Sequence, residues 1–122
     1  MTDYLEPVDV EQLVESMGFH LRDRNLLLSA LAAPLPVFGE EVYESLHRKA
    51  AALMIAINRD HPLSDGNKRL SWMVSKAFLA LNGEHLAART VPEGDAFVRA
   101  VAGNHLPLDD VVMWIQTHST RL

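Results

Sequence analysis

The apolar residues of one central segment recur at the spacing of a single helix face: Leu70, Met73, Val74, Ala77, Phe78 and Leu81. Steps of three and one place all of them on the same side of an α-helix. Asn82 and Gly83 follow directly, and such a pair is typical of a helix C-terminus. The pattern predicts a helix over 67–82 that must bury one face against other parts of the chain.

Five further segments have helical periodicity and are predicted as helices: 9–17, 23–33, 44–59, 94–102 and 107–118. Asp9 is predicted to cap the first of them, and Gly18 to end it. Residues 34–40 (PLPVFGE) contain two prolines and a glycine, which predicts an extended or hairpin-like segment too short to found a sheet. The expected fold is a single compact all-α domain over 1–122 with one short extended element.

Composition excludes several classes of protein. A chain of 122 residues is expected to form one domain with a core of its own. It contains no cysteine, which excludes disulfides and thiolate zinc sites and suits the reducing cytoplasm. The acidic N-terminus does not resemble a secretory signal, and no apolar run approaches the roughly 20 residues of a membrane span. A formal net charge of −5 argues against nucleic acid or a membrane as a direct partner, so any positive site must be local.

Residues 61–69 (HPLSDGNKR) concentrate polar chemistry between two of the predicted helices. Gly66 permits a left-handed or closely approached backbone, and the amides after it begin a helix whose N-terminus attracts anions. Lys68 and Arg69 add two positive charges beside those amides, and Asn67 can donate a neutral hydrogen bond. This half of the segment is typical of a phosphate-binding site, although the Walker A spacing is absent.

The first half of the segment supplies the other groups that phosphoryl transfer needs. Asp65 is a hard oxygen ligand of the kind that Mg²⁺ takes beside substrate phosphates. His61 is the side chain best suited to accept a hydroxyl proton near neutral pH. Positioning and charge neutralisation account for most of such catalysis, so one rigid loop with these groups would suffice.

Each of these residues also has a purely structural interpretation. His61 could cap the carbonyls that end the preceding helix, and Asp65 could be the N-cap of the following one. Lys68 and Arg69 could belong to a solvated helix face. Composition alone does not decide between these interpretations and a phosphate site.

The segment closely resembles the signature of the Fic/Doc superfamily, which runs His-x-Phe-x-Asp/Glu-Gly-Asn-Gly/Lys-Arg. Six positions match it: His61, Asp65, Gly66, Asn67, Lys68 and Arg69. Leu63 replaces the phenylalanine and keeps an apolar anchor for the loop. The likeness continues over 46–83, and residues 96–115 resemble the closing helical pair of the death-on-curing (Doc) toxins.

Two positions distinguish the branches of this superfamily. AMP-transferring Fic enzymes generally carry a second glycine after the asparagine and a second arginine three residues after the first. Lys68 and Trp72 stand at those positions here, and the pattern resembles the Doc branch. That branch implies transfer of the γ-phosphate of ATP to a threonine of elongation factor Tu, which blocks translation.

The resemblance also implies a role for each matching residue. His61 would be the general base. Asn67 and Arg69 would assist catalysis, Asn67 by steadying a phosphate and Arg69 by neutralising its charge. Asp65 would hold Mg²⁺. The residues implied to bind ATP are Gly66, Asn67, Lys68 and Arg69.

The resemblance further implies how the protein meets its partners. Residues 34–40 stand where the family has its flap, which aligns the target peptide, although a plain connector between helices is an equally good interpretation. The family's inhibitory motif, Ser/Thr-x-x-x-Glu-Gly/Asn, is absent, which implies a separate Phd-like antitoxin. The alternative enzyme is a Fic-type AMP transferase, and the alternative from another class is a catalytically silent binding module.

Overall fold

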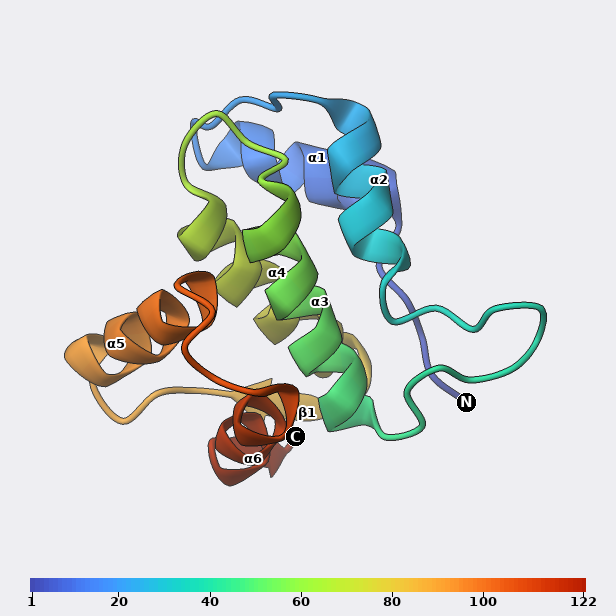
Figure 1. Ribbon diagram of the computed structural model, residues 1–122, viewed down its shortest axis with the longest axis vertical. Helices are drawn as coiled ribbons and strands as arrows, with labels where there is room; N and C mark the ends of the chain where they lie inside the picture. The colour runs from blue at the N-terminus through green and yellow to red at the C-terminus, as the bar shows by residue number, and fades with distance from the viewer.

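The computed structural model describes residues 1–122 and contains six helices and one two-stranded sheet (Figure 1). The helices are α1 (Pro7–Ser16), α2 (Arg24–Ala32), α3 (Leu46–Asp60), α4 (Asn67–Leu81), α5 (Val91–Ala102) and α6 (Leu108–Thr117). The strands are β1 (Glu84–Leu86) and β2 (Ser119–Arg121). The predicted all-α class is confirmed. None of the helices is both long and apolar enough to cross a membrane.

Helix α3 occupies the centre of the molecule. It packs most extensively against α4 and also against α2, α5 and α6. Ala50, Ala51 and Ala56 on this helix are at most 1 % exposed. Their small side chains let the surrounding helices approach closely, so α3 forms the middle of the core and fixes where its C-terminal loop lies.

The apolar stripe of α4 packs into the core along one row. Leu70, Val74 and Phe78, spaced by four residues, are at most 1 % exposed. Met73 and Leu81 belong to the predicted stripe, but they are 36 % and 47 % exposed. Met73 lies at the flank of the buried row and Leu81 in the last turn, so both reach solvent.

Two helices begin earlier than predicted. Helix α1 has Pro7 in its first turn and Glu6 as its N-cap, so the prediction of Asp9 as the cap is wrong and Asp9 lies inside the helix. Helix α5 begins at Val91 rather than at 94 because the Thr90 side chain accepts a hydrogen bond from the Glu93 backbone N–H. The other helix ends lie within two residues of the predicted ones.

The small sheet has no counterpart in the sequence-based prediction. Strands β1 and β2 pair antiparallel, with Glu84 opposite Arg121, His85 opposite Thr120 and Leu86 opposite Ser119. Each strand has three residues, which is too short to show an alternating pattern. Leu86 is fully buried, so the sheet closes the end of the core beyond α4 and α6.

Residues 34–40 contain a tight hairpin, as the sequence predicts. Val37 and Glu40 exchange two backbone hydrogen bonds, of 2.8 and 3.0 Å, around a turn formed by Phe38 and Gly39. Both turn residues have positive φ, of 51° and 79°. In Figure 1 the chain from 34 to 45 extends away from the helices, between the end of α2 and the start of α3.

A buried lysine ties this extended segment to the core. Lys49 is 1 % exposed, and its Nζ lies 2.8 Å from Glu41 Oε2 and 2.9 Å from Tyr4 Oη. Burial lowers the pKa of Lys49, but the hydrogen bonds to Glu41 and Tyr4 outweigh burial and hold that pKa above its ordinary value. The N-terminal segment and the base of the hairpin are therefore both fastened to α3.

Candidate active site

The loop of residues 61–69 joins the C-terminus of α3 to the first turn of α4. His61 ends α3 in a left-handed conformation, with φ 51° and ψ 60°, and its N–H donates to the Ile57 carbonyl. Pro62 and Leu63 are buried, whereas His61 and Asp65 are exposed. The apolar residues thus anchor the loop in the core and leave its polar side chains facing solvent.

Gly66 is required by a close contact. Its φ is 90°, and a Cβ placed there would lie 2.6 to 2.8 Å from ring carbons of Phe19. Gly66 is the N-cap of α4, so the interpretation of Asp65 as that cap is wrong. Asp65 Oδ1 instead accepts a hydrogen bond of 2.9 Å from the Gly66 N–H. Because no side chain caps α4, its first amides remain available to an anion.

Asn67 closes the loop upon itself. Its Oδ1 accepts from the Leu63 N–H at 2.9 Å, and its Nδ2 donates to the Leu63 carbonyl at 3.0 Å. The second hydrogen of that amide nitrogen remains free to donate elsewhere. Asn67 therefore holds the loop in shape, a role that the sequence did not reveal.

The second half of the loop lines a pocket of about 760 Å³. The loop contributes Asp65, Gly66, Asn67, Lys68 and Arg69. The remaining walls come from Phe19, from the exposed side of α4 and from the start of α5: Trp72, Lys76, Ala87, Ala88, Thr90, Val91, Gly94, Asp95, Val98 and Arg99. Such a volume suits a ligand of nucleotide size. The pocket brings together five of the six predicted site residues, whereas His61 lies outside its lining.

The pocket has unpaired positive charge at its loop end. Lys68 and Arg69 are exposed and form no ion pair with any carboxylate of the chain. The Arg69 guanidinium lies 5.8 Å from the centre of the Phe19 ring, which holds its stem beside the loop. Two free cations beside an uncapped helix N-terminus form an arrangement that favours phosphate.

One carboxylate in this pocket suits a magnesium ion. Asp65 is exposed at the pocket, and no group of three or more His, Cys, Asp or Glu side chains could hold a metal on its own. Mg²⁺ commonly takes one or two carboxylates and completes its shell with substrate phosphates and water. The residues therefore fit a magnesium ion that arrives with a nucleotide rather than a resident one.

The wall formed by α5 is fixed by an aromatic stack. The Trp114 ring stacks on the rings of Phe97 and His118, with 3.8 Å and 3.6 Å between the ring centroids. His118 Nε2 lies 3.0 Å from Glu93 Oε1. The hydrogen bond from the Arg89 backbone N–H to Glu93, assisted by His118, lowers the pKa of that carboxyl below its ordinary value. No motif signalled these residues, because they meet only through the packing of α5 on α6.

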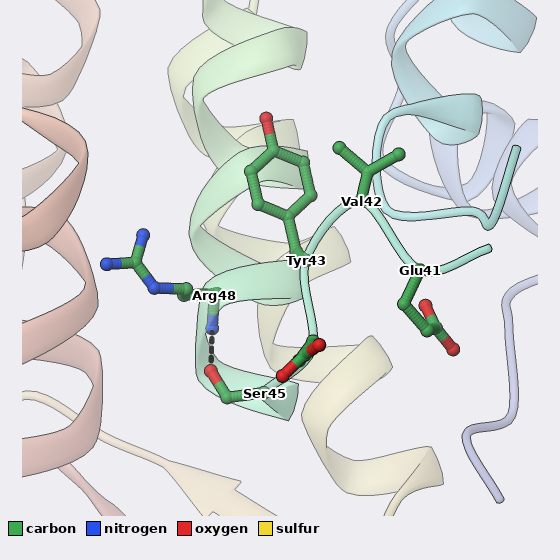
Figure 2. A pocket seen from close by; sticks show the side chains of 6 residues that line it. Glu41, Val42, Tyr43, Ser45 and Arg48 are labelled. Carbon is green, nitrogen blue, oxygen red and sulfur yellow. Dashed lines mark hydrogen bonds between the residues drawn. The ribbon is translucent and has the colours of Figure 1, made fainter.

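A second pocket, of about 530 Å³, lies at the other end of α3. Figure 2 shows its lining, with the Ser45 hydroxyl accepting a hydrogen bond from the Arg48 backbone N–H. Glu41 and Glu44 contribute carboxylates, and the Arg48 guanidinium is paired with Asp109. Without a free cation, this pocket does not suit phosphate, so the candidate active site is the pocket beside the 61–69 loop.

Comparison with known proteins agrees with this geometry. Residues 5–79, more than half of the chain, match the profile of the Fic/DOC family. The chain belongs to the Fic/Doc family. It is 38 % identical over 117 residues to Toxin Doc of Mycolicibacterium smegmatis, which covers 91 % of this chain and 89 % of that protein. No solved structure matches the chain significantly. The resemblance to the Doc branch, drawn from residues 61–69 and Trp72, is thereby confirmed.

Proposed function

We propose that this Fic/Doc protein is a toxin of the Doc type that transfers the γ-phosphate of ATP to a hydroxyl of a protein target. The observation that carries the proposal is the pair of free cations, Lys68 and Arg69, beside the uncapped N-terminus of α4 in a pocket of nucleotide size. Lys68 occupies the position where AMP-transferring relatives generally have glycine, which favours phosphate transfer over AMP transfer.

In the proposed reaction, the oxygen of the target hydroxyl forms a bond to the γ-phosphorus of ATP. The bond between that phosphorus and the β–γ bridging oxygen breaks, and ADP leaves. His61 takes the proton of the hydroxyl. This residue is exposed and lies outside the nucleotide pocket, as suits a base for a hydroxyl of another protein.

The remaining loop residues bind and orient the triphosphate. Lys68, Arg69 and the first amides of α4 neutralise its negative charge, and the free hydrogen of Asn67 Nδ2 is available to a phosphate oxygen. Asp65 would hold Mg²⁺. When bound, this ion would supply further positive charge beside the phosphates.

The target and the antitoxin belong to the same proposal. A threonine of elongation factor Tu is the expected target, with a block of translation as the consequence, and a Phd-like antitoxin is the expected inhibitor. The name of the Mycolicibacterium relative supports a toxin. Residues 34–40 would align the target peptide as the family's flap does, and the exposed residues Leu35 and Val37 are the ones to test.

The test is a labelling experiment with the purified protein, Mg²⁺ and a bacterial lysate, run in parallel with γ-labelled and α-labelled ATP. We expect label from the γ position only, on a protein of the size of elongation factor Tu. The His61→Ala variant should lose it, whereas His85→Ala, which changes an exposed histidine on β1, should retain it.

Other outcomes would replace the proposal. Label from the α position would identify an AMP transferase. A third outcome combines two results: no label is transferred from either position, and expression of the wild type and of His61→Ala is equally toxic. This outcome would identify a binding module without catalysis.

A further inference from the structure

The short connection between α1 and α2 runs alongside the active-site loop. Leu21 and Leu63 pair as an antiparallel bridge. The Ser64 N–H donates to the His20 carbonyl at 3.2 Å, and the Arg22 N–H donates to the Pro62 carbonyl at 2.7 Å. Figure 1 shows this connection beside the loop between α3 and α4. We call residues 19–22 the backing segment.

The side chain of Arg22 adds two hydrogen bonds at the point where α3 ends. Its Nε donates to the His61 carbonyl at 3.0 Å and its Nη2 to the Asp60 carbonyl at 3.2 Å. Carbonyls in the last turn of a helix have no partner within it, and a cation there also interacts favourably with the helix dipole. Arg22 makes no ion pair, so its guanidinium serves only these carbonyls.

These bonds fix the backbone on both sides of His61. The carbonyl of His61 is held by the Arg22 side chain, and the next carbonyl, of Pro62, by the Arg22 backbone. His61 has a left-handed conformation, which a residue with a Cβ adopts only when its surroundings impose it. His61 caps α3 through its own N–H, which donates to the Ile57 carbonyl, and Arg22 adds donors to the carbonyls of Asp60 and His61.

We infer that Arg22 is a positioning residue that holds the backbone of His61, and thereby aims its imidazole at the target hydroxyl. The inference rests on the proposed function, in which His61 takes the proton. Arg22 does not line the nucleotide pocket, so its effect falls on the base and not on ATP binding. It acts only through the backbone and touches no reacting atom.

Kinetics of three variants test the inference. In Arg22→Ala we expect kcat to fall roughly tenfold or more, because small misplacements of a catalytic group are costly. The KM for ATP and the affinity for ATP measured by calorimetry should stay within about twofold, since the phosphate-binding half of the loop keeps its own contacts. Arg22→Lys should recover part of kcat because an ammonium group can still reach one carbonyl.

Arg24→Ala is the matched control. Arg24 is two positions further along, 57 % exposed and paired with Glu11 on α1, away from the loop. Its removal should leave kcat unchanged. An unchanged kcat in Arg22→Ala would overturn the inference. So would a parallel loss of ATP affinity, which would show that Arg22 supports the whole loop rather than the base.

A second measurement separates this inference from the proposed function. The NMR signals of the His61 ring report its surroundings whether or not the protein transfers phosphate. They should change in Arg22→Ala and stay as in the wild type in Arg24→Ala. If the wild type transfers no phosphate, the proposed function fails, and His61 signals unmoved by Arg22→Ala would still overturn the positioning role.

Discussion

At the scale of single residues, the contact between Gly66 and Phe19 gives the sharpest expectation. Gly66→Ala places a Cβ at 2.6 to 2.8 Å from the Phe19 ring and imposes a φ of 90° on alanine. The ring or the loop must move, so we expect a lower melting temperature and a large loss of transfer activity. Thermal unfolding followed by circular dichroism and the labelling assay measure the two effects.

Gly83→Ala separates backbone strain from the clash. Gly83 has a similar φ of 86°, but a Cβ there meets nothing within 4 Å. It should therefore lose only the stability that alanine loses at positive φ, about 1 kcal/mol, and keep its activity. Equal losses of stability and activity in the two variants would contradict a specific role for the contact with Phe19.

The sequence reveals the residues of the loop better than it reveals their partners. The spacing of residues 61–69 predicts a polar loop with a glycine at a helix start, and in the structure Gly66 is the N-cap of α4 at the end of this loop. It does not predict that Phe19 faces Gly66 or that Arg22 reaches the end of α3. Those contacts join positions 38 to 47 residues apart, and no local pattern encodes a contact of that range.

At the scale of elements, the first turn of α5 makes stability depend on pH. Hydrogen bonding from Arg89 lowers the pKa of Glu93 in the folded protein below its ordinary value of 4.5. A carboxyl with a depressed folded pKa stabilises the fold above the unfolded pKa and loses that contribution as pH falls through the folded one. Glu93→Gln cannot titrate, so its melting temperature should fall less steeply than that of the wild type below pH 4.5.

Glu15→Gln provides the comparison for this measurement. Glu15 is an exposed carboxylate on α1 whose side chain forms no ion pair and no hydrogen bond. Melting temperatures of the three proteins between about pH 3 and pH 7 should show a pH-dependent offset for Glu93→Gln only. An offset for Glu93→Gln that stays constant over this range would show that the charge of Glu93 does not stabilise α5.

The elements were predictable where a long apolar stripe defines them. Helix α4 has such a stripe and begins at the predicted residue. Helix α5 begins with Pro92 and Gly94 close together, residues that usually punctuate loops, and only the Thr90 cap reveals its true start. Strands β1 and β2 have three residues each and exist only because the chain brings them together after α6.

At the scale of the whole molecule, the pocket beside the 61–69 loop belongs to no single element. One wall is the loop and α4, and the opposite wall is the start of α5 and the residues before it. Periodicity predicts each helix, but it does not predict the angle at which two helices pack or whether that packing leaves a pocket between them. The sequence could therefore predict a loop suited to phosphate, whereas the pocket that extends from this loop arises only from the packing of α5 against α4.

This arrangement predicts that ATP with Mg²⁺ stabilises the entire fold, because the ligand would contact both walls and bind only the folded chain. At a free concentration of about 100 times Kd the gain is roughly 2.7 kcal/mol. For a chain of 122 residues that corresponds to a rise in melting temperature of roughly 10 °C. Lys68→Ala and Arg69→Ala should lose most of this rise, since each removes a free cation from the pocket.

Arg121→Ala removes the same charge from β2, outside the pocket, and should keep the full rise in melting temperature. Asp65→Asn should keep a rise with ATP alone but lose the increment that Mg²⁺ adds, because its amide is a poorer ligand for a hard cation than a carboxylate. Differential scanning fluorimetry with and without Mg²⁺ measures both. If all four variants responded as the wild type does, the nucleotide would bind elsewhere, and the 61–69 loop would have to act on a phosphate held by another part of the molecule.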